Sequence, residues 1–399
     1  MRWREPAPTR KVDVVVERRP VTVIDNVLPS SVAESAVPQK SQDQHTQDPR
    51  TGRLPRPASS RRVRQQNDYA DLKRLVVQQG LLDKQLGYYI SNTVIRLAFL
   101  GASLTFLLTV ESFWLQLLNA AFLAFVFTQL GFLGHDAGHR QIFNGAPRNA
   151  LFGLAINLLL GISRSWWVDT HNQHHVNPND LDLDPHTALP VFAFSEEQAR
   201  SKRGPLRLLV GYQSFYFVPV LLLEGIGVRA ASVQYLLRGK AKDRVVEALL
   251  MALHFVLYLG LLFYLLSVWQ ALLFIVVHQA MLGLYMGLVF APNHKGMPLL
   301  DSTSQLDFLR RQVITSRDVN AHPLTDFLYG GLNYQIEHHL FPNMPRNKLK
   351  DAQRIVKAFC EARSIPYRES SVLQSHKEIF QYLHQVSAPL RKSRGLIAR

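Results

Sequence analysis

Four long apolar runs constrain this chain more than any other feature of its sequence. They lie at about residues 90–110, 113–134, 245–268 and 270–291. Since a bilayer core requires about 20 residues of helix, the runs predict two helical hairpins that cross a membrane. Two shorter runs are too short or too interrupted to span, and they suit interfacial or partly inserted helices. These shorter runs are residues 150–162 and 206–228. The expected fold class is an all-α integral membrane protein with four transmembrane helices.

The basic residues predict how these helices are oriented. The chain has a formal net charge of +15, yet the loops at 111–112 and near 267–270 contain no Lys or Arg. The N-terminal segment, residues 140–244 and the part after 291 hold nearly all the basic side chains. By the positive-inside rule these three parts, both termini included, are cytoplasmic. Topology therefore explains the charge, and we expect no nucleic-acid partner, because no Arg-rich helix with interleaved aromatic residues accompanies it.

Composition divides the chain into three parts. Residues 1–66 are basic, rich in Arg, Pro, Ser and Gln, and predicted to be mostly disordered. Residues 67–388 form the predicted functional domain, which opens with a helix that Asp68 to Asp71 could cap at a membrane surface. Residues 389–399 are a basic tail. The first ten residues are polar and predict no secretory signal.

The balance of cysteine and histidine narrows the chemistry. One cysteine, Cys360, excludes a disulfide framework, a Cys-ligated zinc site and a Cys-held iron–sulfur cluster. Histidine is plentiful, with 15 residues. Seven of them form three clusters, all on the side that the charge assigns to the cytoplasm. The clusters are His135 and His139; His171, His174 and His175; and His338 and His339.

The spacing within each cluster suits metal binding. Residues three or four apart share one face of a helix, so His135 and His139 can point at one ion. The second cluster can do the same over one turn. His338 and His339 would diverge by about 100° on a helix and could serve neighbouring metals. Seven imidazoles are too many for one ion and suit two, and sulfur-free imidazole coordination suits iron, zinc or copper.

Further residues extend the predicted site. His294 follows the fourth apolar run at the same membrane surface and is a candidate eighth ligand. Carboxylates often orient a ligating ring by accepting a hydrogen bond from its second nitrogen. The candidates for that role are Asp136, Asp169 and Glu337. His254 and His278 lie inside predicted spans, and we expect each to be a packing or tunnel residue.

The three clusters resemble the histidine motifs of the membrane fatty-acid desaturases. The resemblance rests on Gly134–Arg140 (GHDAGHR), Trp166–Asn179 (WWVDTHNQHHVNPN) and Gly331–Pro342 (GLNYQIEHHLFP), and extends from about residue 67 to 386. It implies four spans and a cytosolic helical cap that holds a histidine-rich di-iron site. It also implies two iron ions held by the seven clustered histidines, with His294 at an additional ligand position of the family.

The third motif departs from the commonest family pattern. Many desaturases begin it with His, whereas this chain has Gln335. That departure resembles the front-end desaturases, which act between an existing double bond and the carboxyl end. Three roles stay open for Gln335: it could touch iron, hold a water ligand or only shape the site.

The resemblance implies O2-dependent desaturation of a fatty acyl chain, carried on CoA or in a membrane lipid, with formation of a cis double bond. A di-iron lipid hydroxylase or ketolase is one alternative, because it would share the oxidant and differ only in substrate placement. A membrane metal-binding or transport protein is a second. Transport would require ionisable residues along the spans, where His254 and His278 are the only histidines and Glu247, at one end, is the only acidic residue.

The electrons are expected from a separate protein. Front-end desaturases often carry a fused cytochrome b5 domain with an HPGG haem motif, which this sequence does not contain. A ferredoxin, rubredoxin or free cytochrome b5, with its reductase, is therefore expected, and the basic cytoplasmic face could steer its docking. The lack of a signal, retention motif or fused donor favours a bacterial inner membrane.

Overall fold

The structure is a computed structural model that describes residues 58–239, 241–301 and 303–395. Residues 1–57 of the segment predicted to be disordered lie outside these ranges. The last four residues of the basic tail also lie outside them. The described part of the chain is almost entirely helical. Four helices within it are long and apolar enough to cross a membrane, which confirms the predicted fold class. They are α2 (Leu86–Thr109), α3 (Phe113–Gly138), α10 (Arg244–Leu265) and α11 (Val268–His294).

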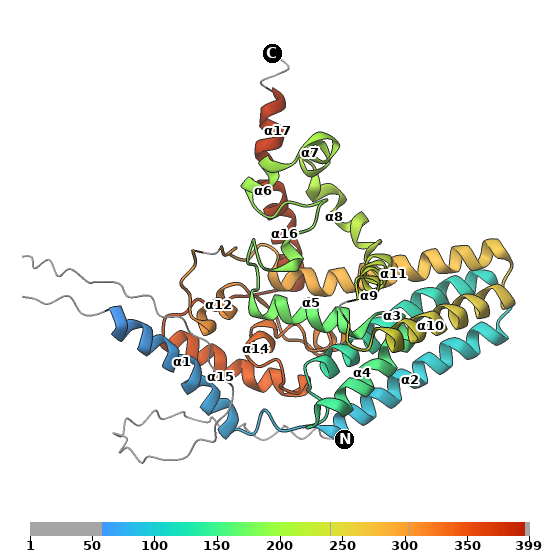
Figure 1. Cartoon of the computed structure of the whole chain (residues 1–399), viewed down its shortest axis with the longest axis horizontal. Coiled ribbons are helices and arrows are strands. Elements are labelled where there is room, and N and C mark those ends of the chain that lie inside the picture. The colour runs from blue at the N-terminus through green and yellow to red at the C-terminus, as the bar shows by residue number, and fades with distance from the viewer. Residues whose placement is uncertain (1–57, 240, 302, 396–399) are drawn as a thin grey trace, which may run out of the picture. The chain divides into compact units, whose positions relative to one another are not determined.

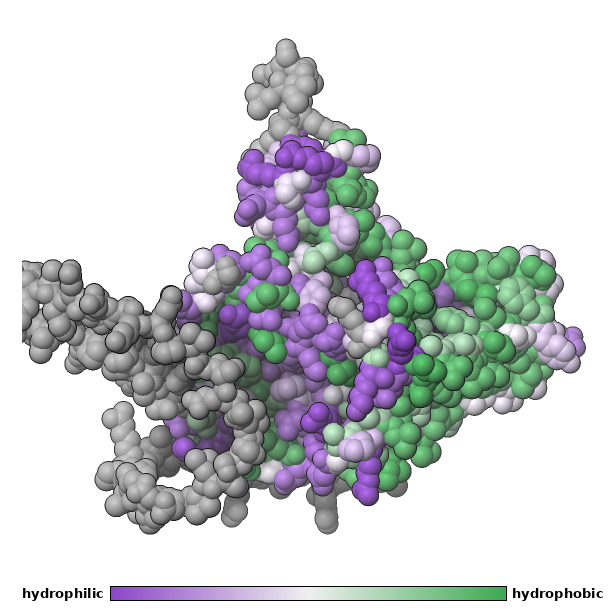
Figure 2. Space-filling view, viewed as in Figure 1, coloured by the Kyte–Doolittle hydropathy of each residue, from purple (hydrophilic) through white to green (hydrophobic). Residues whose placement is uncertain are grey.

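These four helices lie side by side as a bundle, and the remaining elements gather around one end of it (Figure 1). We call this second part the cap. Figure 2 shows hydrophobic residues over the bundle and many hydrophilic residues over the cap. The cap contains α1 (Ala58–Gln78), α4 (Ala146–Leu160), α5 (Arg164–Val176), η1 (Pro185–Thr187), α6 (Glu196–Ser201), α7 (Gly204–Val210), α8 (Gln213–Leu221), α9 (Glu224–Leu237), α12 (Phe308–Ile314), β1 (Asp318–Val319), α13 (Pro323–Leu328), α14 (Gln335–Leu340), η2 (Arg346–Lys348), α15 (Leu349–Ala362), β2 (Glu369–Ser370), α16 (Val372–Val386) and α17 (Ala388–Gly395).

The two shorter apolar runs lie in bent helix pairs. Helices α4 and α5 meet at 110°, and α8 and α9 meet at 73°. By length and composition each pair could be a broken span or a re-entrant loop. In either case the chain reverses direction at the bend between α4 and α5. Helix α5 carries the second histidine cluster.

Two of the spanning helices continue beyond their predicted ends. Helix α3 runs to Gly138 and α11 to His294, although the apolar runs end near residues 134 and 291. The added turns are polar but buried inside the cap, which supplies partners that a bilayer would not. This extension places His135 and His294 inside the cap.

A buried polar network joins the bundle to the cap. The guanidinium of Arg96 on α2 donates to Asn92 Oδ1 at 2.5 Å and to Gln129 Oε1, on α3, at 2.9 Å. The Gln129 amide donates in turn to the hydroxyl of Tyr285 on α11 and to the carbonyl oxygen of Phe327 on α13. Polar side chains inside a helical bundle are costly unless they are paired. Here each contact also ties one helix to the next.

The first cap helix differs from the prediction. It begins at Ala58, so Asp68 lies in its interior and is not its N-cap. Asp68 instead pairs with Arg310 and Arg363, each at 2.9 Å. Leu72 and Val76 are fully buried in a core shared with α12, α14 and α15, so this apolar face covers the cap and not a membrane surface.

Cys360 belongs to the same core. It lies on α15, is fully buried, and is a free thiol. Burial first, and then the nearby carboxyl of Glu337, raise the pKa of this thiol to about 12. The thiol is therefore protonated at neutral pH.

Two glycines let the backbones of α11 and of the α8–α9 pair come into direct contact. A Cβ added to Gly283 on α11 would lie 2.4 Å from the carbonyl oxygen of Leu221, and one added to Gly225 on α9 would lie 2.7 Å from that of Gln279. Small residues at such crossings let membrane helices pack closely. The contact holds the α8–α9 bend against α11.

Substitution of Gly283 tests this contact. Gly283→Ala should destabilise the protein by about 1–3 kcal/mol, because the added methyl group must displace backbone atoms. Gly260→Ala on α10 is the matched control, since a Cβ there meets nothing within 4 Å. Thermal unfolding in detergent measures both. Equal midpoints for the two variants would show that the helices are not in such close contact.

Candidate metal centre

The structure brings all eight predicted ligand histidines together at the cap end of α3 and α11. Seven of them form two groups, within each of which the ligand nitrogens lie no more than 4.8 Å apart. Group one is His135, His139, His171 and His338; group two is His174, His294 and His339. His175 lies between the groups: its Nε2 is 3.1 Å from that of His171, and its ring stacks on His339 with centroids 4.1 Å apart.

The third cluster contributes to both groups. His338 and His339 are neighbours on the short helix α14 (Gln335–Leu340), and both side chains are buried. Adjacent positions on a helix diverge by about 100°, so one ring faces group one and the other faces group two. This placement is the one that their spacing predicts.

Four of the rings are oriented through their Nδ1 atoms. Each Nδ1 lies 2.9–3.1 Å from an oxygen acceptor. The pairs are His135 with Asp136, His174 with Asp184, His294 with the carbonyl oxygen of Thr315, and His339 with the side-chain oxygen of Gln312. Since such acceptors hold the hydrogen on Nδ1, the lone pair of each ring lies on Nε2.

These lone pairs are what a metal ion would require. In group two, the Nε2 atoms of His174 and His294 lie 3.2 Å apart, a separation at which two lone pairs repel unless a cation lies near both. The Nε2 atoms of His135, His139 and His339 are buried without a hydrogen-bond partner among the described residues. Buried polar atoms rarely stay unpaired, so the residues of both groups fit metal ions.

The protonation state of the third cluster supports this fit. Burial, with a smaller contribution from neighbouring imidazoles, holds the pKa of His338 and of His339 well below the ordinary value. Both rings are therefore neutral at physiological pH. Neutral imidazole is the form that binds metal.

Gln335 lies directly against group two. Its amide nitrogen is 2.9 Å from His294 Nε2, and its oxygen accepts a hydrogen bond from Asn293 at 3.0 Å. The side chain is buried. Gln335 thus contacts a candidate ligand atom.

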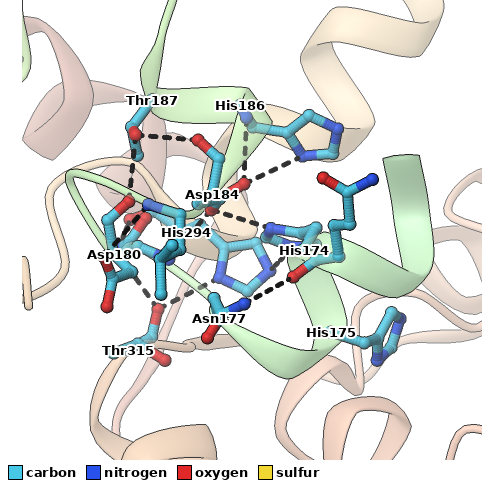
Figure 3. A network of polar contacts seen from close by, with 12 residues as sticks. His174, His175, Asn177, Asp180, Asp184, His186, Thr187, His294 and Thr315 are labelled. Atoms are coloured by element: carbon cyan, nitrogen blue, oxygen red, sulfur yellow. Dashed lines mark hydrogen bonds and ion pairs between the residues drawn. The ribbon is translucent and has the colours of Figure 1, made fainter. Parts of the chain in front are cut away.

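Asp184 is a functional candidate that the sequence reading missed. One of its carboxylate oxygens accepts from His174 Nδ1 and from the backbone N–H of Asn179, both at 2.9 Å, and Figure 3 shows it between His174 and His186. Burial opposes its ionisation, but the hydrogen bond with His174 and the charges of His174, His186 and Lys295 together outweigh burial and hold the pKa of this carboxyl below its usual value. The sequence feature that could have indicated this role is the acidic segment Asp180–Asp184, which follows the second cluster.

Of the carboxylates predicted to orient a ligand ring, Asp136 does so and Asp169 does not. Asp136 contacts His135 as expected, and its second oxygen accepts from Arg346 in a buried ion pair. Asp169 instead accepts from the hydroxyl of Tyr235 at 3.3 Å. It forms no hydrogen bond with a candidate ligand ring within the described ranges.

Glu337 also differs from its predicted role. It accepts from the hydroxyl of Tyr367 at 2.9 Å, and that hydroxyl also contacts Asp318 at 2.6 Å. Burial and the facing carboxyl of Asp318 raise the pKa of Glu337 well above its usual value. On α14 its side chain diverges from that of His338 by about 100°, and it meets Tyr367 instead of a ligand ring.

Substitution of Asp184 tests the two-group arrangement. Asp184→Asn should weaken metal binding at group two by about 10- to 100-fold, because His174 loses its charged acceptor. Iron content per purified protein should then fall toward half. Asp182→Asn, an exposed carboxylate two residues away, is the control and should keep its iron. Full iron content in Asp184→Asn would contradict the role of this carboxylate.

Acid titration gives a second test. Protons compete with metal for imidazole, and ordinary imidazoles would begin to release it near their pKa of about 6.5. Because burial lowers the pKa of His338 and His339, iron should stay bound through that pH and leave only at lower values. Iron retained after buffer exchange across this range is the measurement. Release centred near the ordinary pKa would contradict the expectation.

Comparison with known proteins places these features in a family. A family model described as fatty acid desaturase matches residues 112–371. An acyl-lipid (9-3)-desaturase of Physcomitrium patens is 29% identical over 80% of this chain and 62% of its own length. Delta(8)-fatty-acid desaturase 2 of Arabidopsis thaliana is 31% identical over 76% and 71%, and Delta(6)-fatty-acid desaturase fat-3 of Caenorhabditis elegans is 30% identical over 75% and 70%. The chain therefore belongs to the fatty acid desaturase family.

Proposed function

We propose that this protein is a front-end fatty acyl desaturase that binds two iron ions through its two histidine groups. The observation that carries the proposal is the convergence of eight imidazoles, four of which have a buried Nε2 atom without a hydrogen-bond partner among the described residues. The names of the relatives, which include Delta(6) and Delta(8) fatty-acid desaturases, support the acyl substrate. Gln335, which begins the third motif, supports the front-end class.

The proposed ligands follow the geometry of the groups. His135, His139, His171 and His338 would hold one ion, and His174, His294 and His339 the other, with His175 between them. Bound iron would supply the O2-dependent removal of two hydrogens from adjacent carbons. Gln335 would complete group two through its side-chain oxygen, either directly or through water, because the side chain lies against His294. The surrounding acceptors would keep each ring in the tautomer that binds metal.

A narrow cavity lies against group one and has room for a short segment of an acyl chain. It has a volume of about 80 Å³, and His135 and Trp167 form part of its wall. We call it the apolar cavity. Most of its other walls are hydrophobic, among them Phe127, Phe132, Leu160, Leu282, Met286 and Phe290. A chain threaded here would pass beside the metal centre, sheltered from water.

The cellular arrangement is proposed from charge. The cap would face the cytoplasm, since most of the basic residues that the structure describes outside the spans belong to it. An acidic electron donor, a ferredoxin, rubredoxin or cytochrome b5 supplied by its reductase, would dock on that basic face. The acyl group would arrive on CoA or in a membrane lipid. A bacterial inner membrane stays a prediction.

Expression with a donor and reductase tests the function. In cells supplied with an unsaturated fatty acid, we expect a new cis double bond between the existing one and the carboxyl end, located by mass spectrometry of derivatised fatty acids. A hydroxylated product would instead favour the lipid hydroxylase. An unchanged lipid profile with an active donor and two bound metals would favour metal binding or transport.

Matched histidine variants complete the test. His139→Ala or His174→Ala should abolish turnover yet leave membrane insertion intact, because each removes one proposed ligand. His384→Ala alters an exposed histidine outside both groups and should keep activity. Full activity in both ligand variants would show that the assignment is wrong.

A further inference from the structure

Arg164 is an arginine without a partner. It is the first residue of α5, is half-buried, and forms no hydrogen bond or ion pair with another described residue. Its Nε atom is fully buried. A cation is disfavoured at the N-terminus of a helix, and a buried donor that lacks an acceptor is costly. The placement of Arg164 is therefore unexplained by the fold alone.

Two cavities meet at this side chain. One is the apolar cavity, whose wall Arg164 shares with His135 and Trp167. The other, which we call the polar cavity, has a volume of about 410 Å³ and is lined by Arg164, Arg140 and Asn172, among others. Arg164 is thus common to a narrow hydrophobic space and a wide polar one.

Both cavities also border the candidate metal centre. His135 of group one lines the apolar cavity, and His139 of the same group lines the polar cavity. The boundary between the cavities therefore lies beside group one. A molecule that occupied both would pass the metal centre close to the point where it contacts Arg164.

A second unpaired donor lines the apolar cavity. Asn157, near the end of α4, lines the apolar cavity, and its amide nitrogen is buried without a hydrogen-bond partner among the described residues. Arg164 and Asn157 flank the turn between α4 and α5. Two donors that lack acceptors indicate a ligand that carries an oxygen acceptor at this place.

An acyl substrate has the matching pattern. Its hydrocarbon chain is apolar, its carrier is polar, and a single carbonyl oxygen separates the two. With the chain in the apolar cavity and the carrier in the polar one, the carbonyl would lie where the cavities meet. The guanidinium offers five donors in a fixed plane and suits such an oxygen.

We propose, on the basis of the proposed desaturase function, that Arg164 binds the acyl carbonyl oxygen and so sets the distance from the carbonyl to the metal centre. Asn157 adds a second donor to the same oxygen. Because the chain is held by its carbonyl end, the double bond is placed by counting carbons from that end. A lipid ester and a CoA thioester both offer a carbonyl oxygen that Arg164 could bind.

Three variants test this proposal. Arg164→Gln removes the charge and keeps an amide donor, Arg164→Lys keeps the charge, and Arg200→Gln removes an exposed arginine on α6 as the matched control. Each is purified with its iron content measured, then assayed with acyl-CoA in detergent and with phospholipid vesicles that carry the same acyl chain. The carrier that wild type accepts identifies the source of the carbonyl.

The expected result is a split between binding and turnover. Arg164→Gln should raise KM by about 10- to 100-fold, the loss expected when a hydrogen bond to a charged group is removed, while iron content and the order of magnitude of kcat are retained. It should also yield products whose double bond is displaced along the chain. Arg164→Lys should recover most of the KM, and Arg200→Gln should match wild type.

Two results would overturn the proposal. One is an unchanged KM and double-bond position in Arg164→Gln. The other is a loss of iron or of kcat alone, which would assign Arg164 a structural role. Absence of any desaturated product from wild type with an active donor would instead refute the proposed function, so the two failures are distinguishable.

Discussion

Eight imidazoles lie together at one place, and the groups that orient four of them organise the cap. The Nδ1 acceptors come from several separate segments, including α3, the turn at η1 and helix α12. Helix α12 shows the arrangement well. Gln312 accepts from His339 and donates to the carbonyl oxygen of His175, so one side chain orients one candidate ligand and holds the backbone of another. The histidine motifs therefore depend on residues that lie outside them.

The same region couples the cap to the membrane helices. The carboxylate of Asp136 contacts both His135 and Arg346, which links the end of α3 to the segment before α15. Arg317 is fully buried and donates to the carbonyl oxygens of Pro292 and Lys295 at the end of α11. Buried charges that lose a partner are strongly destabilising. Movement of the cap relative to the bundle would break these contacts, so the two parts hold the ligand rings as one unit.

Sequence patterns predicted the parts of this structure that follow from local geometry. Apolar length predicted the four spans, and helical spacing predicted that His338 and His339 face different groups. The start of α1 could not be predicted in this way. Asp68 has the residue type of a helix cap, but it lies inside α1, where it forms ion pairs with Arg310 and Arg363.

The orienting residues show the same limit. Asp184 and Gln312 contact ligand rings, yet no short motif connects them with the histidines. Glu337 lies within a motif and turns away, because burial beside Asp318 determines its contacts. The tertiary fold, which spacing does not encode, decides which carboxylate meets which ring.

The burial of the Cys360 thiol affects how easily this protein can be oxidised and how it can be labelled. Oxidation and alkylation of cysteine begin from the accessible thiolate, and this sulfur is buried and protonated at neutral pH. Under the proposed function, reactive oxygen that escaped from the metal centre would find no easily oxidised cysteine in the chain. For the same reason the natural sequence already serves as a cysteine-silent background, in which a spectroscopic label would report only on positions chosen by substitution.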